Sequence, residues 1–425
     1  MIKTKNKEAA FLYRLFQFIA ILIIFDGVRS NTIGGSFITA LRDLSVLFLL
    51  WYTVFIKKFS AQKVFSSTIL LFIAYHTIIS IFTILFQPSY TPALILKPYF
   101  LIICIYIFQY FEEITKRTYQ EYIKFIITVS IVFVFFNTVF YFVPAPFLIE
   151  QKLWWGRISI AYPTMDVVTL SYVLILLMYY PNIKISSIKR IIYMFIIISG
   201  IFFQFSGTGI ILFGGIFISF VYYLIFSSNK ILKKEILILI SIIIMMSGSI
   251  ISYVKLQFTE EYETGIALIE NKISILSGDI GDNDFNTMDI RQQAIDNTKK
   301  KYVNNSFSKV FGIGLGKATN DLSKLSKDKS LFMLEDQYSL INICYGYIGL
   351  FLFSIIIISF VLKSVKSKLP TNLKIMFLNA GFIFATNCKT LTSLYLFPNY
   401  VFIALFFILI KKEIYAYHNR LPYVG

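Results

Sequence analysis

Long apolar stretches recur along almost the whole chain, each close to the ~20 residues that a helix needs to cross a bilayer. Short polar segments separate them. The pattern predicts an all-α, polytopic integral membrane protein with about twelve transmembrane helices. The predicted helices cover residues 9–25, 38–56, 66–86, 93–111, 122–143, 165–181, 189–205, 209–227, 235–253, 337–362, 373–387 and 394–410.

One polar segment is much longer than the others and divides the chain. Residues 1–254 hold about nine of the predicted transmembrane helices, and residues 337–425 hold about three. Between them, residues 255–336 are predicted to form one long extracytoplasmic loop that is partly helical. We find no internal repeat, heptad pattern or low-complexity tract that would suggest another division.

The basic residues predict the orientation of the helices. With the N-terminus in the cytoplasm, the cytoplasmic segments hold 23 Lys and Arg, and the outer segments other than the long loop hold 6. The long loop is left out of this comparison because loops beyond ~60 residues are translocated largely regardless of charge. We therefore expect both termini to be cytoplasmic and the long loop to lie outside.

Composition narrows the possible partners. Hydrophobic residues make up 57% of the 425 residues and charged residues 15%, against about 25% charged in soluble domains. The net charge of +17 lies mainly in short cytoplasmic loops, which favours contact with anionic membrane lipids over nucleic acid. Three widely spaced cysteines, Cys104, Cys344 and Cys388, predict neither a disulfide framework nor a metal cluster.

No small-residue cleavage site follows the first apolar stretch, so the first helix is predicted to be an uncleaved signal anchor.

One segment of the long loop, "MDIRQQAIDNTKKKYV", has its apolar residues at the spacing of an amphipathic helix. We expect this helix to lie on the membrane domain. Its apolar residues are Met288, Ile290, Ala294 and Tyr302.

Three glycines at alternating positions, Gly312, Gly314 and Gly316, follow in "SKVFGIGLG". A dinucleotide-binding loop would need a strand before the glycines and a βαβ unit around them, and the surroundings offer neither. Glycine also permits a sharp turn or a close approach of the backbone to a ligand. The segment therefore predicts either a turn alone or a turn that closes against a ligand.

Two arginines are candidates for binding a diphosphate. Arg291 is the sole arginine of the long loop, and Arg157 in "WWGRISIAYPTMD" precedes Asp166 at the predicted outer mouth of the sixth helix. The planar guanidinium fork makes bidentate, charge-assisted bonds to phosphate oxygens. The alternatives are a solvated loop charge for Arg291 and an interfacial anchor for Arg157, which follows two tryptophans.

Where the long loop returns to the membrane, "EDQYSLINICYGYIGL" places Glu335, Asp336 and Tyr338 ahead of Gly346 and Gly349. One of the two carboxylates can serve as a general base that takes a proton from an attacking hydroxyl. The alternative is that both simply flank a helix start, where the helix dipole favours negative charge.

Basic residues near the other outer helix ends are weaker candidates. Arg29 and Arg42 bracket the first outer loop, "DGVRSNTIGGSFITALRD", and can either bind a glycan or pair with the nearby Asp26 and Asp43. Lys97 lies near the outer end of the fourth helix, where it can hold a phosphate or snorkel to the interface.

Three polar residues lie within or beside predicted helices. Arg14 lies near the cytoplasmic end of the first helix, where we expect it to snorkel. His76 is in the middle of a helix, where we expect a hydrogen-bonded packing residue. Lys389 in "NCKTLT" can face an outer cavity.

This order of features resembles the O-antigen polymerase and O-antigen ligase superfamily of bacterial surface-polysaccharide proteins. The resemblance covers most of the chain. Its elements are many apolar helices, one late outer loop, Arg291 followed by the glycines, and a polar pair that opens a Gly-x-x-Gly helix. It implies a membrane glycosyltransferase of the bacterial inner membrane that polymerises oligosaccharide repeat units linked to polyprenyl (undecaprenyl) diphosphate. The product would be the O-antigen of lipopolysaccharide or a capsule.

The resemblance also implies roles for residues and partners. Arginines of two outer loops bind the diphosphate in the family, and here they correspond to Arg157 and Arg291. Together with Arg291, we expect Asp336 or Glu335 to act in catalysis. The remaining predicted substrate-binding residues are Gly312, Gly314, Gly316, Tyr338, Arg29, Arg42 and Lys97. The expected partners are the lipid-linked substrate, membrane lipids and a chain-length regulator protein, and neither a metal nor another cofactor is expected.

The sequence departs from the ligases of this family at one position. Ligases typically have a histidine beside the helix after the long loop, whereas Glu335 and Asp336 stand there in this chain, whose only histidines are His76 and His418. This departure favours a polymerase. Two alternatives stay open: a ligase that moves finished glycan to another lipid, and a flippase or transporter of the lipid-linked unit.

Overall fold

A computed structural model describes most of the chain in separate stretches. The described residues are 2–29, 31–58, 67–86, 92–114, 116–149, 158–160, 163–180, 183, 185–204, 206–226, 237–238, 241, 255–256, 259–260, 262–264, 266–267, 270, 296–297, 299–315, 337–366, 368–390 and 397–418. Within them every regular element is helical, apart from one isolated antiparallel bridge between Thr32 and Leu148. The all-α prediction is therefore confirmed.

The described helices follow one another in chain order. They are α1 (Ile2–Ile24), α2 (Asp26–Arg29), α3 (Gly35–Trp51) with its π-helical continuation η1 (Tyr52–Ile56), α4 (Ser67–Phe86), α5 (Pro92–Ile114), α6 (Lys116–Phe142), α7 (Pro163–Tyr179), α8 (Ser187–Phe203), α9 (Gly207–Phe226), α13 (Ser306–Phe311), α15 (Gln337–Lys366), α16 (Thr371–Thr390) and α17 (Phe397–His418).

The predicted helices match this order, but several ends differ. Each predicted segment overlaps one of these helices, except 235–253, which lies almost wholly outside the described residues. The last two helices were predicted too short, since α16 has 20 residues and α17 has 22. The backbone ladder of a helix continues through polar ends such as Lys411 and Lys412, which an apolar pattern does not count.

Four of the described helices are long and apolar enough to cross a membrane: Gly35–Ile56, Thr68–Phe86, Gln120–Phe142 and Tyr338–Val365. Shorter apolar helices are Ala10–Ile24, Pro98–Tyr110, Asp166–Tyr179 and Thr208–Leu224. The count of about twelve spans stays a prediction. Most of the predicted long loop lies outside the described residues, so the loop stays a prediction too.

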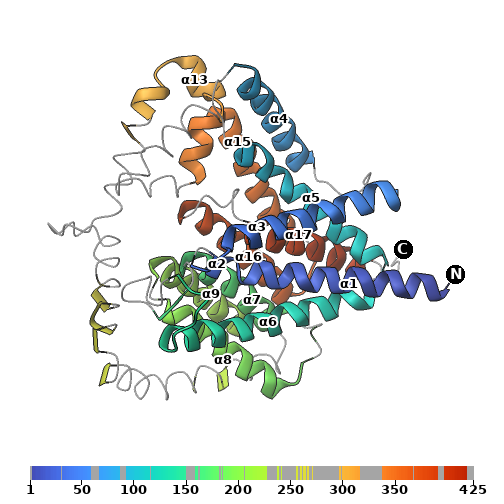
Figure 1. The fold of residues 1–425 in the computed structure, drawn as a ribbon, viewed down its shortest axis with the longest axis vertical. Coiled ribbons are helices and arrows are strands. Elements are labelled where there is room, and N and C mark those ends of the chain that lie inside the picture. Colours follow the sequence, from blue (N-terminus) through green and yellow to red (C-terminus); the bar gives the residue numbers. More distant parts are fainter. Residues whose placement is uncertain are drawn as a thin grey trace.

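The helices form one bundle with two distinct flanks (Figure 1). On one flank, α4, α13 and the first part of α15 pack together, and on the other, α6, α7, α8 and α9 do. Helices α1, α3, α5, α16 and α17 fill the space between.

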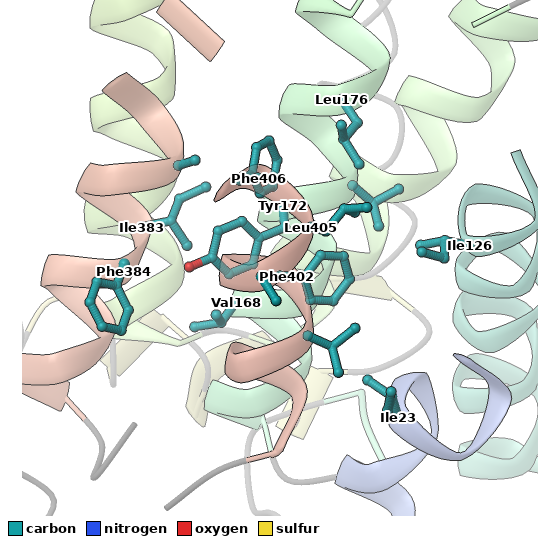
Figure 2. Close-up of a cluster of buried hydrophobic side chains, with 14 of the residues drawn as sticks. Ile23, Ile126, Val168, Tyr172, Leu176, Ile383, Phe384, Phe402, Leu405 and Phe406 are labelled. Carbon is teal, nitrogen blue, oxygen red and sulfur yellow. The ribbon is translucent and has the colours of Figure 1, made fainter. Parts of the chain in front are cut away.

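Helix α7 is the most deeply buried of the helices in this core. Its residues from 166 onwards are all buried, as expected for a helix that is apolar on every face. The Tyr172 ring stacks on Phe402 of α17, with centroids 5.1 Å apart. Figure 2 shows the Tyr172 hydroxyl directed towards Ile383 and Phe384 of α16. Residues far apart in sequence thus enclose one polar atom in an apolar core.

Candidate functional site

The two described glycines of the long loop lie in a turn that follows α13. Asn305 caps this helix with a reciprocal capping box, in which its side chain accepts from the Ser308 amide. The helix ends at Gly312, whose φ of 79° and ψ of −175° fall in a region that only glycine adopts readily. Gly314 also has a positive φ, of 82°. The predicted turn is therefore confirmed at Gly312 and Gly314, whereas Gly316 lies outside the described residues.

The turn packs against a break in α15. We predicted a continuous helix over 337–362, but Gly346 has φ 66° and ψ −166°, so the helix is interrupted there. An interrupted helix leaves carbonyl groups without their usual amide donors. Here the Ile313 amide donates to Ile343 O at 3.1 Å, and the Gly314 amide donates to Cys344 O at 3.1 Å. The glycine turn thus pairs carbonyls at the break of α15.

The fit between turn and helix leaves no room for side chains. A Cβ on Gly312 would lie 2.3 Å from Cys344 O, and a Cβ on Gly346 would lie 2.3 Å from Val310 O. These glycines therefore allow the backbones of two segments of the chain to approach each other closely. The Leu315 amide extends this contact to α4 by donating to Thr83 Oγ1 at 2.9 Å.

Two side chains of α4 complete the contact. The Tyr75 hydroxyl can donate to Tyr345 O at 2.9 Å or to Phe311 O at 3.1 Å. His76 Nε2 lies 2.8 Å from Ile95 O, which only accepts, so Nε2 carries the proton. In the neutral ring Nδ1 then accepts from the Tyr345 hydroxyl at 2.8 Å. The prediction that His76 is a hydrogen-bonded packing residue is confirmed. We call this region the glycine-turn dock: residues 312–315, Ile343 to Gly346 of α15, and Tyr75, His76 and Thr83 of α4.

Tyr302 links the predicted amphipathic segment to the same place. It packs with Val303 and Ile313 on Ile343 of α15. Residues 299–302 are helical, while Met288, Ile290 and Ala294 lie outside the described residues. The predicted contact of this segment with the membrane domain is thus confirmed at Tyr302.

A second region lies where α7 and α9 begin and α8 and α16 end. A Cβ on Gly209 of α9 would lie 3.4 Å from Val167 Cγ1 of α7 and 3.7 Å from Ile201 Cγ2 of α8, which brings these ends together. Helix α16 runs antiparallel to α7, because Asn372 Nδ2 near its start donates to Tyr179 O at the end of α7, at 3.0 Å. The last turns of α16 therefore lie towards the start of α7.

An ion pair is buried beside this end. Arg42 of α3 is 5% exposed and Asp26 of α2 is 4% exposed, and Arg42 Nη1 contacts Asp26 Oδ1. Arg42 also donates to Asp43 through Nε, at 2.9 Å. Of the two alternatives that the sequence left open for Arg42, the structure contains the ion pairs. Asp166, in the first turn of α7, lies within electrostatic range of Asp26.

The chain enters this end immediately after Arg157. The Ile158 amide donates to Phe203 O of α8 at 3.0 Å, and the Ile160 amide donates to Asn137 Oδ1 of α6 at 2.9 Å. Asn31 Nδ2 donates to Ile160 O at 3.1 Å. These bonds hold residues 158–160 in place, although Arg157 itself lies outside the described residues.

Three buried side chains at this end lack hydrogen-bond partners in the described part of the chain. They are Asp166 at Oδ2, Gln204 at Oε1 and Asn387 at both Oδ1 and Nδ2, with exposed fractions of 2%, 1% and 0%. Buried polar groups are normally paired, and an unpaired one costs about 1–3 kcal/mol. We call Asp26, Arg42, Asp166, Gln204 and Asn387 the polar end of the bundle.

Sequence reasoning only partly found these residues. Asp166 was noted at a helix mouth but not placed in the site, and Gln204 and Asn387 were missed. The signal was a neutral polar residue at the end of an apolar helix, in "QFSGTG" and "NCKTLT". The side-chain amides of Gln204 and Asn387 carry no charge, so a search of the sequence for charged residues does not find them.

The other predicted site residues divide into two groups. Tyr338 is half-buried, and its hydroxyl donates to Ala385 O of α16 at 3.2 Å, so the start of α15 lies beside the end of α16. Outside the described residues lie Arg157, Arg291, Gly316, Glu335 and Asp336, and the side chains of Arg29, Lys97 and Lys389. The predicted diphosphate ligands Arg157 and Arg291 and the predicted bases Glu335 and Asp336 therefore all lie outside the part of the chain that the structure describes.

Comparison with known proteins adds no relative. No protein-family model matches the chain, and no curated protein matches it. A functional hypothesis therefore rests on the residues and their arrangement.

Proposed function

We propose that this protein is a membrane glycosyltransferase that polymerises lipid-linked oligosaccharide repeat units into O-antigen or capsular polysaccharide. The donor is a growing chain on polyprenyl diphosphate, and the acceptor is a single lipid-linked unit. The proposal includes about twelve transmembrane helices in a bacterial inner membrane, cytoplasmic termini and a long outer loop.

The observation that carries the proposal is the polar end of the bundle. Buried polar side chains with atoms that no described residue pairs lie beside the segment that directly follows Arg157. Ionisable groups buried in a membrane bundle are costly and usually serve function. A purely structural bundle end would pair these groups or replace them with apolar ones.

In the proposed reaction, a hydroxyl of the acceptor sugar attacks the anomeric carbon of the donor chain. Its proton passes to Asp336 or Glu335, the new glycosidic C–O bond forms, and the bond from the anomeric carbon to the diphosphate oxygen breaks. Arg157 and Arg291 stabilise the departing lipid diphosphate, on which negative charge develops. A single displacement of this kind inverts the anomeric centre and needs neither metal nor nucleotide sugar.

The decisive experiment is reconstitution. Purified protein in detergent or liposomes is given lipid-linked repeat units extracted from cells that lack the protein, and the glycan products are separated by size. A ladder of longer lipid-linked chains supports the polymerase. Transfer of glycan onto a different lipid supports a ligase, and movement of units across the bilayer without a new glycosidic bond supports a flippase.

The role of Arg291 is tested in cells. A deletion strain is rescued with the wild type, with Arg291→Ala or with Lys299→Ala, a nearby charge change in the same loop. We expect Arg291→Ala to yield surface glycan of a single repeat unit, with a loss of polymerisation of at least ~10²-fold. Lys299→Ala should yield the normal long ladder. A normal ladder from Arg291→Ala would refute its contact with the diphosphate.

A further inference from the structure

The unpartnered atoms of the polar end include both acceptors and a donor. Asp166 Oδ2, Gln204 Oε1 and Asn387 Oδ1 are oxygens that accept hydrogen bonds, whereas Asn387 Nδ2 only donates. All three side chains are more than nine-tenths buried. The chemistry of these atoms defines what kind of ligand could satisfy them together.

This combination argues against a simple ion. A cation such as Na⁺ or Ca²⁺ binds oxygen lone pairs and would leave the Asn387 N–H unpaired. A diphosphate ester accepts but does not donate, so it would leave the acceptor oxygens of this set unpaired. A hydroxyl group donates one hydrogen bond and accepts others, so neighbouring hydroxyls on one molecule can satisfy all of these atoms.

Asp166 contributes an acceptor oxygen to this set. Its Oδ2 is buried and has no hydrogen-bond partner within the described residues. A carboxyl group keeps an oxygen that can accept from a hydroxyl donor whether it is ionised or protonated.

We propose that Asp166, Gln204 and Asn387 form a binding subsite for the hydroxyl groups of a saccharide. Asp166 and Gln204 accept from the sugar, and Asn387 both donates to it and accepts from it. The identification of the ligand as a saccharide rests on the proposed function. The subsite binds and orients the sugar, and the chemical step stays with the residues of the outer loops.

The test combines stability and binding, measured on the purified full-length protein in detergent. The variants are Asp166→Asn and Asn387→Leu. Asn372→Leu is the matched control, because Asn372 is a buried asparagine of the same helix whose side chain donates to Tyr179 O. The probes are lipid-linked oligosaccharide extracted from cells without the protein, and undecaprenyl diphosphate, which carries no sugar.

Without a probe, we expect Asn387→Leu to unfold at the wild-type temperature or a few degrees above it, because it removes unpaired groups. Asn372→Leu should unfold several degrees lower. If Asn387→Leu falls as far as the control, the Asn387 side chain is paired within the fold, and the subsite is refuted.

With a probe, the measured quantity is the rise in unfolding temperature caused by the oligosaccharide beyond the rise caused by undecaprenyl diphosphate, which we call the sugar-dependent shift. The oligosaccharide should raise the unfolding temperature of the wild type more than undecaprenyl diphosphate does, and both variants should lose this difference. Equal differences in wild type and variants would overturn the subsite and leave only buried water at the unpaired atoms. No sugar-dependent shift in the wild type would also overturn it.

The glycosidic-bond assay keeps this inference separate from the proposed function. If the wild type forms no new bond yet shows the sugar-dependent shift, the subsite stands and the polymerase does not. If it forms bonds and both variants remain as active and as responsive as the wild type, the polymerase stands and the subsite does not. We expect both variants to lose at least ~10-fold of product formation.

Discussion

The glycine-turn dock and the polar end differ in whether their buried polar groups are paired within the described residues. In the dock, carbonyls at the break in α15 receive bonds from the Ile313 and Gly314 amides, and His76 uses both ring nitrogens. At the polar end, Asp166, Gln204 and Asn387 are just as buried, yet they have unpaired atoms within the described residues. The start of α15 lies close to both regions, since Tyr338 reaches Ala385 of α16.

The difference separates structure from function. The G-x-G-x-G sequence suggested a ligand loop, but its described glycines complete the protein's own fold. The polar end has no comparable sequence motif, yet it holds buried groups that no described residue pairs. A satisfied region should lose stability when it is changed, whereas an unsatisfied one should gain stability and lose function.

The largest expected effect comes from Arg42. Its replacement by Met removes the guanidinium that pairs with Asp26, and Asp26 stays buried within electrostatic range of Asp166. Removal of one partner from a buried pair costs about 3–5 kcal/mol. We expect a loss of this size in the free energy of unfolding in detergent. Arg14→Met, at an exposed position of α1, should change it by less than about 0.5 kcal/mol. Equal losses would show that the pair contributes nothing specific.

Gly346→Ala should have the next largest effect. Its glycine-only backbone angles cost a side chain about 1–3 kcal/mol, and the displaced backbone adds at least about 1 kcal/mol. A loss of about 2–4 kcal/mol should follow in the same unfolding measurement, because a Cβ would lie 2.3 Å from Val310 O.

Two glycines with open space around them separate strain from steric clash. Gly34 has a φ of 81° with no atom near its Cβ position, so Gly34→Ala should cost only about 1–2 kcal/mol. Gly214 in α9 has open space and no positive φ, so Gly214→Ala should be neutral or stabilising by up to about 1 kcal/mol. If all three variants lose the same free energy, the tight contact in the dock does not exist.

Two tyrosine variants compare a paired hydroxyl in the dock, that of Tyr75, with a hydroxyl in the bundle core that no described residue pairs, that of Tyr172. Tyr75→Phe removes a hydroxyl that can bond to Tyr345 O and Phe311 O, so unfolding should become easier by about 0.5–1.5 kcal/mol. An unchanged unfolding free energy would mean that water replaces this hydroxyl without cost.

Tyr172→Phe should act in the opposite direction, with the smallest effect. The Tyr172 hydroxyl is fully buried and has no partner among the described residues, so its removal should stabilise the protein by about 1 kcal/mol. The cavity beside it, of about 20 Å³, can hold one water molecule. A loss of stability in Tyr172→Phe would indicate that such a water pairs the hydroxyl.

The sequence by itself determined the helices and the membrane character of the chain. Apolar runs near the length of a membrane span are a local property, so they place helices such as α4 and α6 without knowledge of their neighbours. Local chemistry also predicted the turn at Gly312, because alternating glycines seldom continue a helix. The helix ends were less certain, since polar residues continue the backbone ladder.

Only the tertiary structure decided which groups are paired. The carbonyls of Ile343 and Cys344, just before the break at Gly346, accept from amides thirty residues earlier in the chain, and no local sequence pattern predicts such a contact. Whether Asp166 or Arg42 is satisfied depends on α2, α3 and α7 meeting at one end of the bundle. Burial and pairing are properties of packed surfaces between distant segments, so the polar end could be found only once the helices were in place.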